Sequence, residues 1–219
     1  MGLSIGIVPV TPLQQNCALI FDDETKRGAV FDPGGDVDAI IAGIEKGGVT
    51  VEAIYLTHGH VDHAAGADEC RDRLTERQGE RVPIVGPHKG DESFLLRMAE
   101  QARMYGIAGA RNVVPDRWLE GGEVETIAGL PFEVSHTPGH APGHVVFHQR
   151  DLGFAHVGDV LFAGSIGRVD LPGSDPDAMM RSIRDVCLTW SDKTQFICGH
   201  GPGSTIGRER QSNPFLQGL

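Results

Sequence analysis

The stretch that decides the fold is residues 58–63, His58-Gly59-His60-Val61-Asp62-His63. It places three imidazoles and one carboxylate within six residues, directly after residues 51–56, whose β-branched and apolar side chains predict a strand. Imidazole and carboxylate ligands suit divalent ions such as zinc, iron or manganese. In a turn these side chains diverge, so one hexapeptide can serve two adjacent ions, and Gly59 lets the backbone bend close to them.

Three further candidate ligands share the same local setting: each follows a predicted strand and lies beside a glycine. They are His140, Asp159 and His200, after predicted strands at 132–136, 154–157 and 195–198. Loops at strand ends carry active-site groups because a rigid sheet positions them. The sequence therefore predicts one metal site that is assembled from four separate strand ends.

The other histidines receive a different interpretation. A lone histidine is more often a surface residue or a hydrogen-bonded core residue than a metal ligand. We therefore expect surface or core positions for four of them, His88, His136, His148 and His156. His144 lies four residues after His140, but the intervening Pro142 excludes a helix that would pair the two. We expect His144 to orient a metal ligand from behind the site.

Short predicted strands alternate with helices in both halves of the chain. Strands are expected at 5–10, 17–21, 29–31, 51–56, 123–127, 132–136, 144–148, 154–157 and 195–198, and helices at 36–46, 67–78, 91–105 and from 176 to about 188. Two sets of strands, each with helices, predict an α/β fold of two packed sheets with helices outside. The length suits a single domain over residues 1–219, and the strand order stays open.

Composition excludes several classes of partner. The chain has 30 Asp and Glu against 19 Lys and Arg, a formal net charge of −11. This balance argues against binding nucleic acid and against docking on an anionic membrane. Four scattered cysteines predict free thiols, and the amino terminus lacks the basic segment of a secretory leader, so a cytoplasmic protein is expected. The oligomeric state is left open.

The pattern His58-x-His60-x-Asp62-His63, followed by His140, Asp159 and His200, resembles the metallo-β-lactamase superfamily of hydrolases over nearly the whole chain. The resemblance implies a four-layer αβ/βα sandwich and a site for two divalent metal ions. It implies one ion held by His58, His60 and His140, and a second held by Asp62, His63 and His200. Asp159 would bridge the two ions.

The charges of such a site suggest a mechanism in which Asp62 and Asp159 are the catalytic carboxylates. Two divalent ions, these carboxylates and a bridging hydroxide leave a net charge of about +1. Such a centre lowers the pKa of bound water toward about 7 and polarises a carbonyl oxygen. The hypothesis is that the metal-bridging hydroxide attacks a thioester carbonyl and a thiolate leaves.

Residues 158–170 and 198–215 narrow the resemblance to small single-domain glyoxalase II-like proteins, which hydrolyse hydroxyacyl-glutathione thioesters such as S-D-lactoylglutathione. Arg168 falls where full-length members place a basic residue for a glutathione carboxylate, and a guanidinium suits that task. Asp170 departs from the aromatic hydroxyl of those members, and the residues after His200 leave no room for their helical domain. A broader thioesterase or lactonase is therefore an alternative.

Two further alternatives remain. Residues 167–170 also resemble persulfide dioxygenases, in which a single iron would use His58, His140 and Asp159, the expected two-histidine, one-carboxylate set. Oxygen uptake with glutathione persulfide would distinguish this activity from thioester hydrolysis. A non-enzymatic metal-binding protein is the third possibility, although structural zinc prefers closed sites rich in cysteine.

Overall fold

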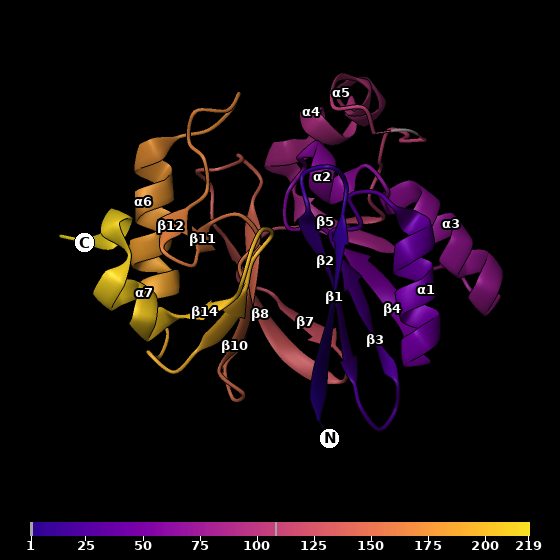
Figure 1. The fold of residues 1–219 in the computed structure, drawn as a ribbon, viewed down its shortest axis with the longest axis horizontal. Helices are drawn as coiled ribbons and strands as arrows, with labels where there is room; N and C mark the ends of the chain where they lie inside the picture. The colour runs from indigo at the N-terminus through magenta and orange to yellow at the C-terminus, as the bar shows by residue number, and fades with distance from the viewer. Residues whose placement is uncertain (1, 108) are drawn as a thin grey trace.

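The computed structural model describes residues 2–107 and 109–219 as two six-stranded mixed sheets that pack face to face between helices (Figure 1). The first sheet holds, in spatial order, β1 (Leu3–Val10), β2 (Gln15–Asp22), β3 (Arg27–Phe31), β4 (Thr50–Tyr55), β5 (Ile84–His88) and β6 (Arg117–Leu119). The second holds β14 (Ser204–Thr205), β13 (Gln195–Ile197), β10 (Phe154–His156), β9 (Val145–Gln149), β8 (Leu130–His136) and β7 (Val124–Ile127). A small ribbon pairs β11 (Leu161–Phe162) with β12 (Ser165–Ile166).

Helices cover the outer face of each sheet. Helices α1 (Val37–Gly47) and α3 (Ala67–Gln78) lie on the first sheet, and α6 (Pro176–Asp185) and α7 (Ile206–Ser212) lie on the second (Figure 1). The remaining helical segments are α2 (Val61–Ala64), α4 (Glu92–Leu95), α5 (Met98–Met104) and the 3-10 turns η1 (Lys89–Asp91), η2 (Cys187–Thr189) and η3 (Pro214–Leu216). This arrangement confirms the four-layer αβ/βα sandwich. Among the described residues, no helix is long and apolar enough to cross a membrane.

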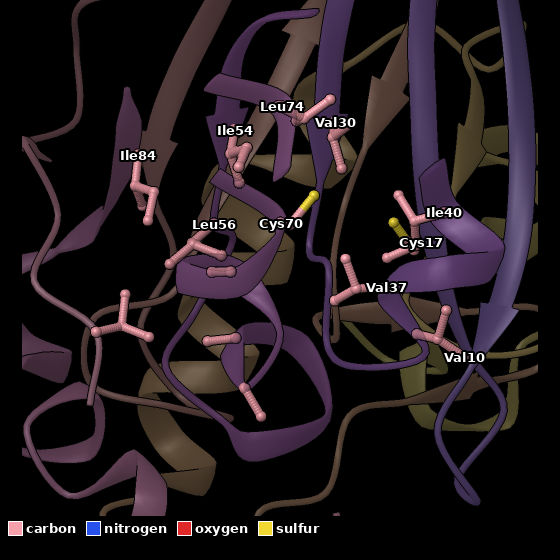
Figure 2. Packing of buried hydrophobic residues seen from close by; sticks show 14 of the residues in the cluster. Val10, Cys17, Val30, Val37, Ile40, Ile54, Leu56, Cys70, Leu74 and Ile84 are labelled. Atoms are coloured by element: carbon pink, nitrogen blue, oxygen red, sulfur yellow. The ribbon is translucent and has the colours of Figure 1, made fainter. Parts of the chain in front are cut away.

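Alternation of side chains along the strands divides the core into three layers. Val30 and Ile54 point from the first sheet toward α1 and α3, where they pack with Leu74 and other apolar residues (Figure 2). Their chain neighbours Phe31 and Tyr55 face the opposite way and pack between the two sheets. A third cluster fills the space between the second sheet and α6 and α7. Successive side chains of a strand therefore enter different layers of the core, as a four-layer sandwich requires.

The prediction of one continuous helix at 91–105 is wrong, because the structure has three short segments there, η1, α4 and α5. A continuous helix would join the carbonyl of Leu95 to the amide of Ala99. Instead that carbonyl accepts from the amide of Val113, and the amide of Ala99 donates to the side chain of Asn112. Contacts with a distant segment thus replace the helical bond. The helix expected to reach residue 188 likewise ends at Asp185 and continues as η2.

Parallel pairing brings the important strand ends to one edge of the sandwich. β3 runs parallel to β4 in the first sheet, and β10 runs parallel to β13 in the second. The start of β2 reaches the same edge, because the amide of Asn16 donates to the carbonyl of Gly199 after β13 at 2.7 Å, and the amide of Gly199 donates to the carbonyl of Gly158 after β10 at 2.9 Å. Residues from both sheets therefore share one site.

Candidate metal centre

The His-x-His-x-Asp-His motif spans a loop and a one-turn helix. His58 and His60 lie in the extended loop after β4, and Asp62 and His63 lie on α2. The change from extended to helical backbone at His60, whose φ and ψ are −72° and 153°, turns the second pair away from the first. The two halves of the motif therefore reach two different points, as the sequence predicts.

One cluster gathers His58, His60 and His140, whose ligand nitrogens all lie within 4.8 Å of one another. Nδ1 of His60 and Nε2 of His140 are 2.9 Å apart. Nδ1 of His140 donates to the carbonyl oxygen of Arg168 at 2.9 Å, which leaves its Nε2 as a bare acceptor. The three nitrogens converge on one point, as they would around an ion.

A second cluster gathers Asp62, His63 and His200 under the same 4.8 Å limit. Nε2 of His200 lies 3.1 Å from Oδ2 of Asp62. Asp159 lies between the clusters, because its carboxylate oxygens are 3.4 Å from Nε2 of His63 and 3.5 Å from Nε2 of His140. The structure thus brings together all seven residues that the sequence singles out as ligands.

The fit of these residues to metal ions rests on buried atoms that lack a partner. Nε2 of His58, Nε2 of His63 and Oδ1 of Asp159 are buried and make no hydrogen bond within the described residues. Leaving such an atom unsatisfied costs about 1–3 kcal/mol. Three unpartnered ligand atoms facing one space, in a donor set of imidazoles and carboxylates, match the needs of divalent cations. The residues therefore form candidate His/Asp metal sites consistent with a binuclear centre.

Asp32, which the sequence analysis does not single out, fixes the histidines from behind. Its fully buried carboxylate lies 2.9 Å from Nδ1 of His63 and accepts from the amide and the hydroxyl of Thr57, both at 2.7 Å. The Thr57 hydroxyl in turn lies 3.0 Å from Nδ1 of His58. Because this hydroxyl donates to Asp32, the two Nδ1 atoms carry the protons and leave both Nε2 atoms free for metal. Its position after strand β3 is the signal that could have revealed Asp32.

The charges of the site suit metal binding. Burial, followed by the neighbouring histidines, lowers the pKa of His58 and lowers the pKa of His60 to about 3, so both rings are neutral at pH 7. Burial opposes ionisation of Asp62 and Asp159, yet the histidines around them, His63 first, hold the pKa of each carboxyl below its usual range. Burial opposes protonation of the two histidines of the second cluster, yet the carboxylates beside them hold the pKa of both rings above its usual range, so each ring must release a proton when a cation binds.

His144 lies behind the centre, where the sequence analysis expects it. Its Nε2 accepts from the amide of Asp159 at 3.0 Å, and its Nδ1 lies 3.1 Å from the hydroxyl of Thr137. Its ring stacks on that of His58 with centroids 4.9 Å apart. Both ring nitrogens thus have protein partners, and the residue contacts both Asp159 and His58.

A cavity of about 610 Å³ opens over the two clusters. Its floor includes the ligand residues His60, Asp62, His140, Asp159 and His200, and its walls are mostly apolar, with Leu13, Phe94, Met104, Tyr105, Phe162 and Leu171 among them. Segments α4 and α5 supply one wall. A mostly apolar cavity with a few convergent polar groups is typical of a site for a small molecule.

Arg168, the predicted substrate-binding residue, lines this cavity and is 68% exposed at its side chain. Its guanidinium pairs with both carboxylate oxygens of Asp170 at 2.9 Å. The side chain therefore lies at the mouth of the cavity, with an acidic partner already in place.

The four histidines for which the sequence predicts a surface or core position lie outside both clusters. His88 stacks on His136 with centroids 3.9 Å apart, His148 stacks on Trp190, and the fully buried ring of His156 stacks on Phe31 between the sheets. Aromatic stacking and burial account for these positions.

The sequence pattern of the Metallo-beta-lactamase superfamily matches residues 10–200. The chain belongs to this superfamily. Among its relatives, Hydroxyacylglutathione hydrolase GloC of Haemophilus influenzae is 40% identical over 98% of both chains. Probable metallo-hydrolase YqgX of Bacillus subtilis is 33% identical over 97% of both chains.

Solved structures of the superfamily agree with this fold. The BLEG-1 B3 metallo-beta-lactamase is 34% identical, covers 98% of this chain and 100% of its own, and superposes with a TM-score of 0.88. The protein TTHA1623, solved in a di-iron-bound form, is 35% identical, covers 96% of this chain and 100% of its own, and has a TM-score of 0.83. With the His/Asp clusters, these likenesses support a metallo-hydrolase of the superfamily.

Proposed function

We propose that the chain hydrolyses a thioester, most specifically a hydroxyacyl-glutathione such as S-D-lactoylglutathione, with the help of two divalent metal ions. The observation that carries the proposal is the pair of His/Asp clusters at the floor of the apolar cavity, with unpartnered ligand atoms on His58, His63 and Asp159. The name of the GloC relative, which is similar over 98% of both chains, supports the thioester class.

The metal ligands of the proposed site are those of the two clusters. His58, His60 and His140 would hold one ion, Asp62, His63 and His200 the other, and Asp159 would reach both. Two such ions, when bound, supply a hydroxide at neutral pH and polarise the carbonyl oxygen of the substrate. Zinc fits this donor set, as do iron and manganese, and the di-iron form of TTHA1623 supports iron as one candidate.

The two aspartates have the catalytic role in this proposal. Both stay ionised because the histidines around them hold their pKa low despite burial, so they offset the charge of the ions. Oδ2 of Asp62, 3.1 Å from Nε2 of His200, would bind the second ion together with that nitrogen. His144 would hold the backbone of Asp159, and Asp32 would hold the ring of His63.

Arg168 is the proposed contact for a carboxylate of glutathione at the mouth of the cavity. The Arg168–Asp170 pair weakens this contact, since the guanidinium must exchange Asp170 for the substrate. The same observation favours a second candidate function, a broader thioesterase or lactonase that recognises its substrate through the apolar wall.

The test is metal analysis of the purified protein together with thioester hydrolysis, measured as release of free thiol. We expect two bound ions per chain and turnover of S-D-lactoylglutathione without oxygen consumption. His58→Ala should lose one ion and at least 10³-fold in kcat/KM. The matched control is His148→Ala, which replaces a buried histidine outside both clusters. It should keep both ions and the wild-type kcat/KM.

Other outcomes separate the alternatives. Faster turnover of simple acyl thioesters or lactones than of glutathione conjugates would favour the broader hydrolase. Oxygen uptake with glutathione persulfide, without thioester turnover, would show a persulfide dioxygenase. Two bound ions without any turnover would contradict an enzymatic role.

A further inference from the structure

A second buried carboxylate, Asp91, lies beside the candidate metal centre. It ends η1 directly before α4, and its side chain is fully buried. Its Oδ2 accepts from the amide of Gly59 at 2.7 Å, and its Oδ1 accepts from the amide of Gly143 at 2.6 Å. Each oxygen of one carboxylate thus binds a different loop.

The two amides belong to the loops that supply the first cluster. Gly59 lies between His58 and His60, and Gly143 lies three residues after His140. The single carboxylate of Asp91 therefore joins the two backbone segments from which all three nitrogens of this cluster project. A change in the spacing of the loops would change the distance between Nδ1 of His60 and Nε2 of His140, now 2.9 Å.

The chain has glycine where this approach is closest. A Cβ on Gly59 would lie 3.0 Å from the Cβ of Asp91. A Cβ on Gly143 would lie 2.5 Å from the backbone nitrogen of Asp91 and 2.4 Å from the carbonyl oxygen of His88. Real Cβ atoms do not come so close to backbone atoms. The contact is therefore built from three positions, an acid and two glycines.

The second cluster is held by contacts that do not involve Asp91. Asp32 holds His63 through Nδ1, and the loop of His200 is tied to β2 through the amide of Asn16. Asp91 makes neither contact. Replacing Asp91 should therefore change the ion affinity of the first cluster more than that of the second.

We propose that Asp91 is a positioning residue that sets the spacing of the 58–60 and 139–144 loops and thereby the affinity of the His58, His60 and His140 position for its ion. The inference rests on the metal centre of the proposed function. Asp91 acts through backbone amides and touches neither ion nor substrate. Both carboxylate oxygens are needed as acceptors, because two N–H groups point at them from opposite loops.

Asp91→Asn tests this requirement with almost no change in shape. The amide keeps one acceptor and turns an NH₂ group toward the other backbone N–H. Asp22→Asn is the matched control, since Asp22 is also buried and accepts from the amides of Glu24 and Thr25 in the turn after β2, at the other end of that strand from the site.

The measurement is stepwise Zn²⁺ affinity of each purified protein, by competition with a chromophoric chelator. We expect Asp91→Asn to weaken one of the two ions about 10–100-fold and the other less than threefold. Asp22→Asn should change neither. Hydrogen exchange in the zinc-loaded wild type is the second measurement, in which the amides of Gly59 and Gly143 should both be slow.

Four results would overturn the proposal. The first is unchanged affinity for both ions in a folded Asp91→Asn protein, the second an equal loss at both positions, the third failure of the variant to fold, and the fourth rapid exchange of either glycine amide in the wild type. An equal loss would assign Asp91 to the fold as a whole. Zinc affinity is measured without substrate, so the result stands apart from whether the wild type hydrolyses thioesters.

Discussion

Replacing Asp32 by asparagine removes a charge from behind the candidate metal centre while keeping the shape of the side chain. The backbone of Asp32 has a φ of +51°, a left-handed conformation that asparagine adopts as readily as aspartate. Alanine would add backbone strain at this position. Asp32→Asn therefore isolates the loss of the carboxylate.

The expected effect follows from the hydrogen bonds of Asp32. Its Oδ2 accepts from the hydroxyl of Thr57 at 2.7 Å and lies 2.9 Å from Nδ1 of His63. An amide nitrogen in that place presents donors to both groups. A neutral His63 ring would then keep its one proton on Nε2 and not on Nδ1, and a protonated Nε2 cannot bind an ion. Loss of such a supporting contact costs about 10–100-fold in metal affinity, which equals about 1.4–2.7 kcal/mol at about 1.4 kcal/mol per factor of ten.

The assay is Zn²⁺ competition with the wild type, Asp32→Asn and a control, Asp36→Asn. Asp36 also has a left-handed backbone, with a φ of +48°, and accepts from the amide of Thr11 at 2.7 Å, but contacts no histidine of the clusters. We expect the ion bound by His63 to weaken most in Asp32→Asn and the ion bound by His58 to weaken less, because Asp32 reaches His58 only through Thr57. Neither ion should weaken in Asp36→Asn. Wild-type affinity for both ions in Asp32→Asn would refute the argument that Asp32 sets the tautomer of His63.

Three further predictions concern metal removal, substrate binding and stability. Chelation should lower Tm in calorimetry, because an ion present at 100 times its Kd contributes about 2.7 kcal/mol; an unchanged Tm would argue against a tightly bound ion. Arg168→Ala should raise KM for a glutathione thioester about tenfold at constant kcat, because it removes one charge-assisted hydrogen bond of about 1.5 kcal/mol. The thioester of an uncharged thiol is the control substrate, for which KM should not change. Equal KM values for the glutathione thioester in the wild type and the variant would exclude the contact. Gly139→Ala should lower the free energy of unfolding, measured in urea, by about 2–6 kcal/mol. The alanine Cβ would lie 2.4 Å from the Cα of Met179, and the φ of residue 139 is +147°. A loss below about 1 kcal/mol would contradict the packing argument.

Much of the fold could be predicted from local patterns. The boundaries of α3 agree with the predicted helix at 67–78, and β1, β2 and β4 agree within about two residues, because their apolar periodicity reflects burial on one or both faces. The break between α4 and α5 could not be predicted in this way. It depends on the amide of Val113 taking the carbonyl of Leu95, a contact between segments that local sequence does not relate.

The sequence by itself determined the chemistry of the site. The types of candidate ligand, their order and their positions after strands are all local properties, and the structure brings those seven residues together. Composition and patterning also indicated the layered architecture.

Only the tertiary structure decided how these residues are held. The strand order, the meeting of the two sheets through Asn16 and Gly199, and the roles of Asp32 and Asp91 all depend on contacts between distant segments. A buried carboxylate is stable only where enough donors surround it, and those donors come from loops that meet after the sheets have packed. From sequence alone, Asp32 therefore looks like an ordinary turn residue after a strand, and Asp91 looks like the first residue of a helix.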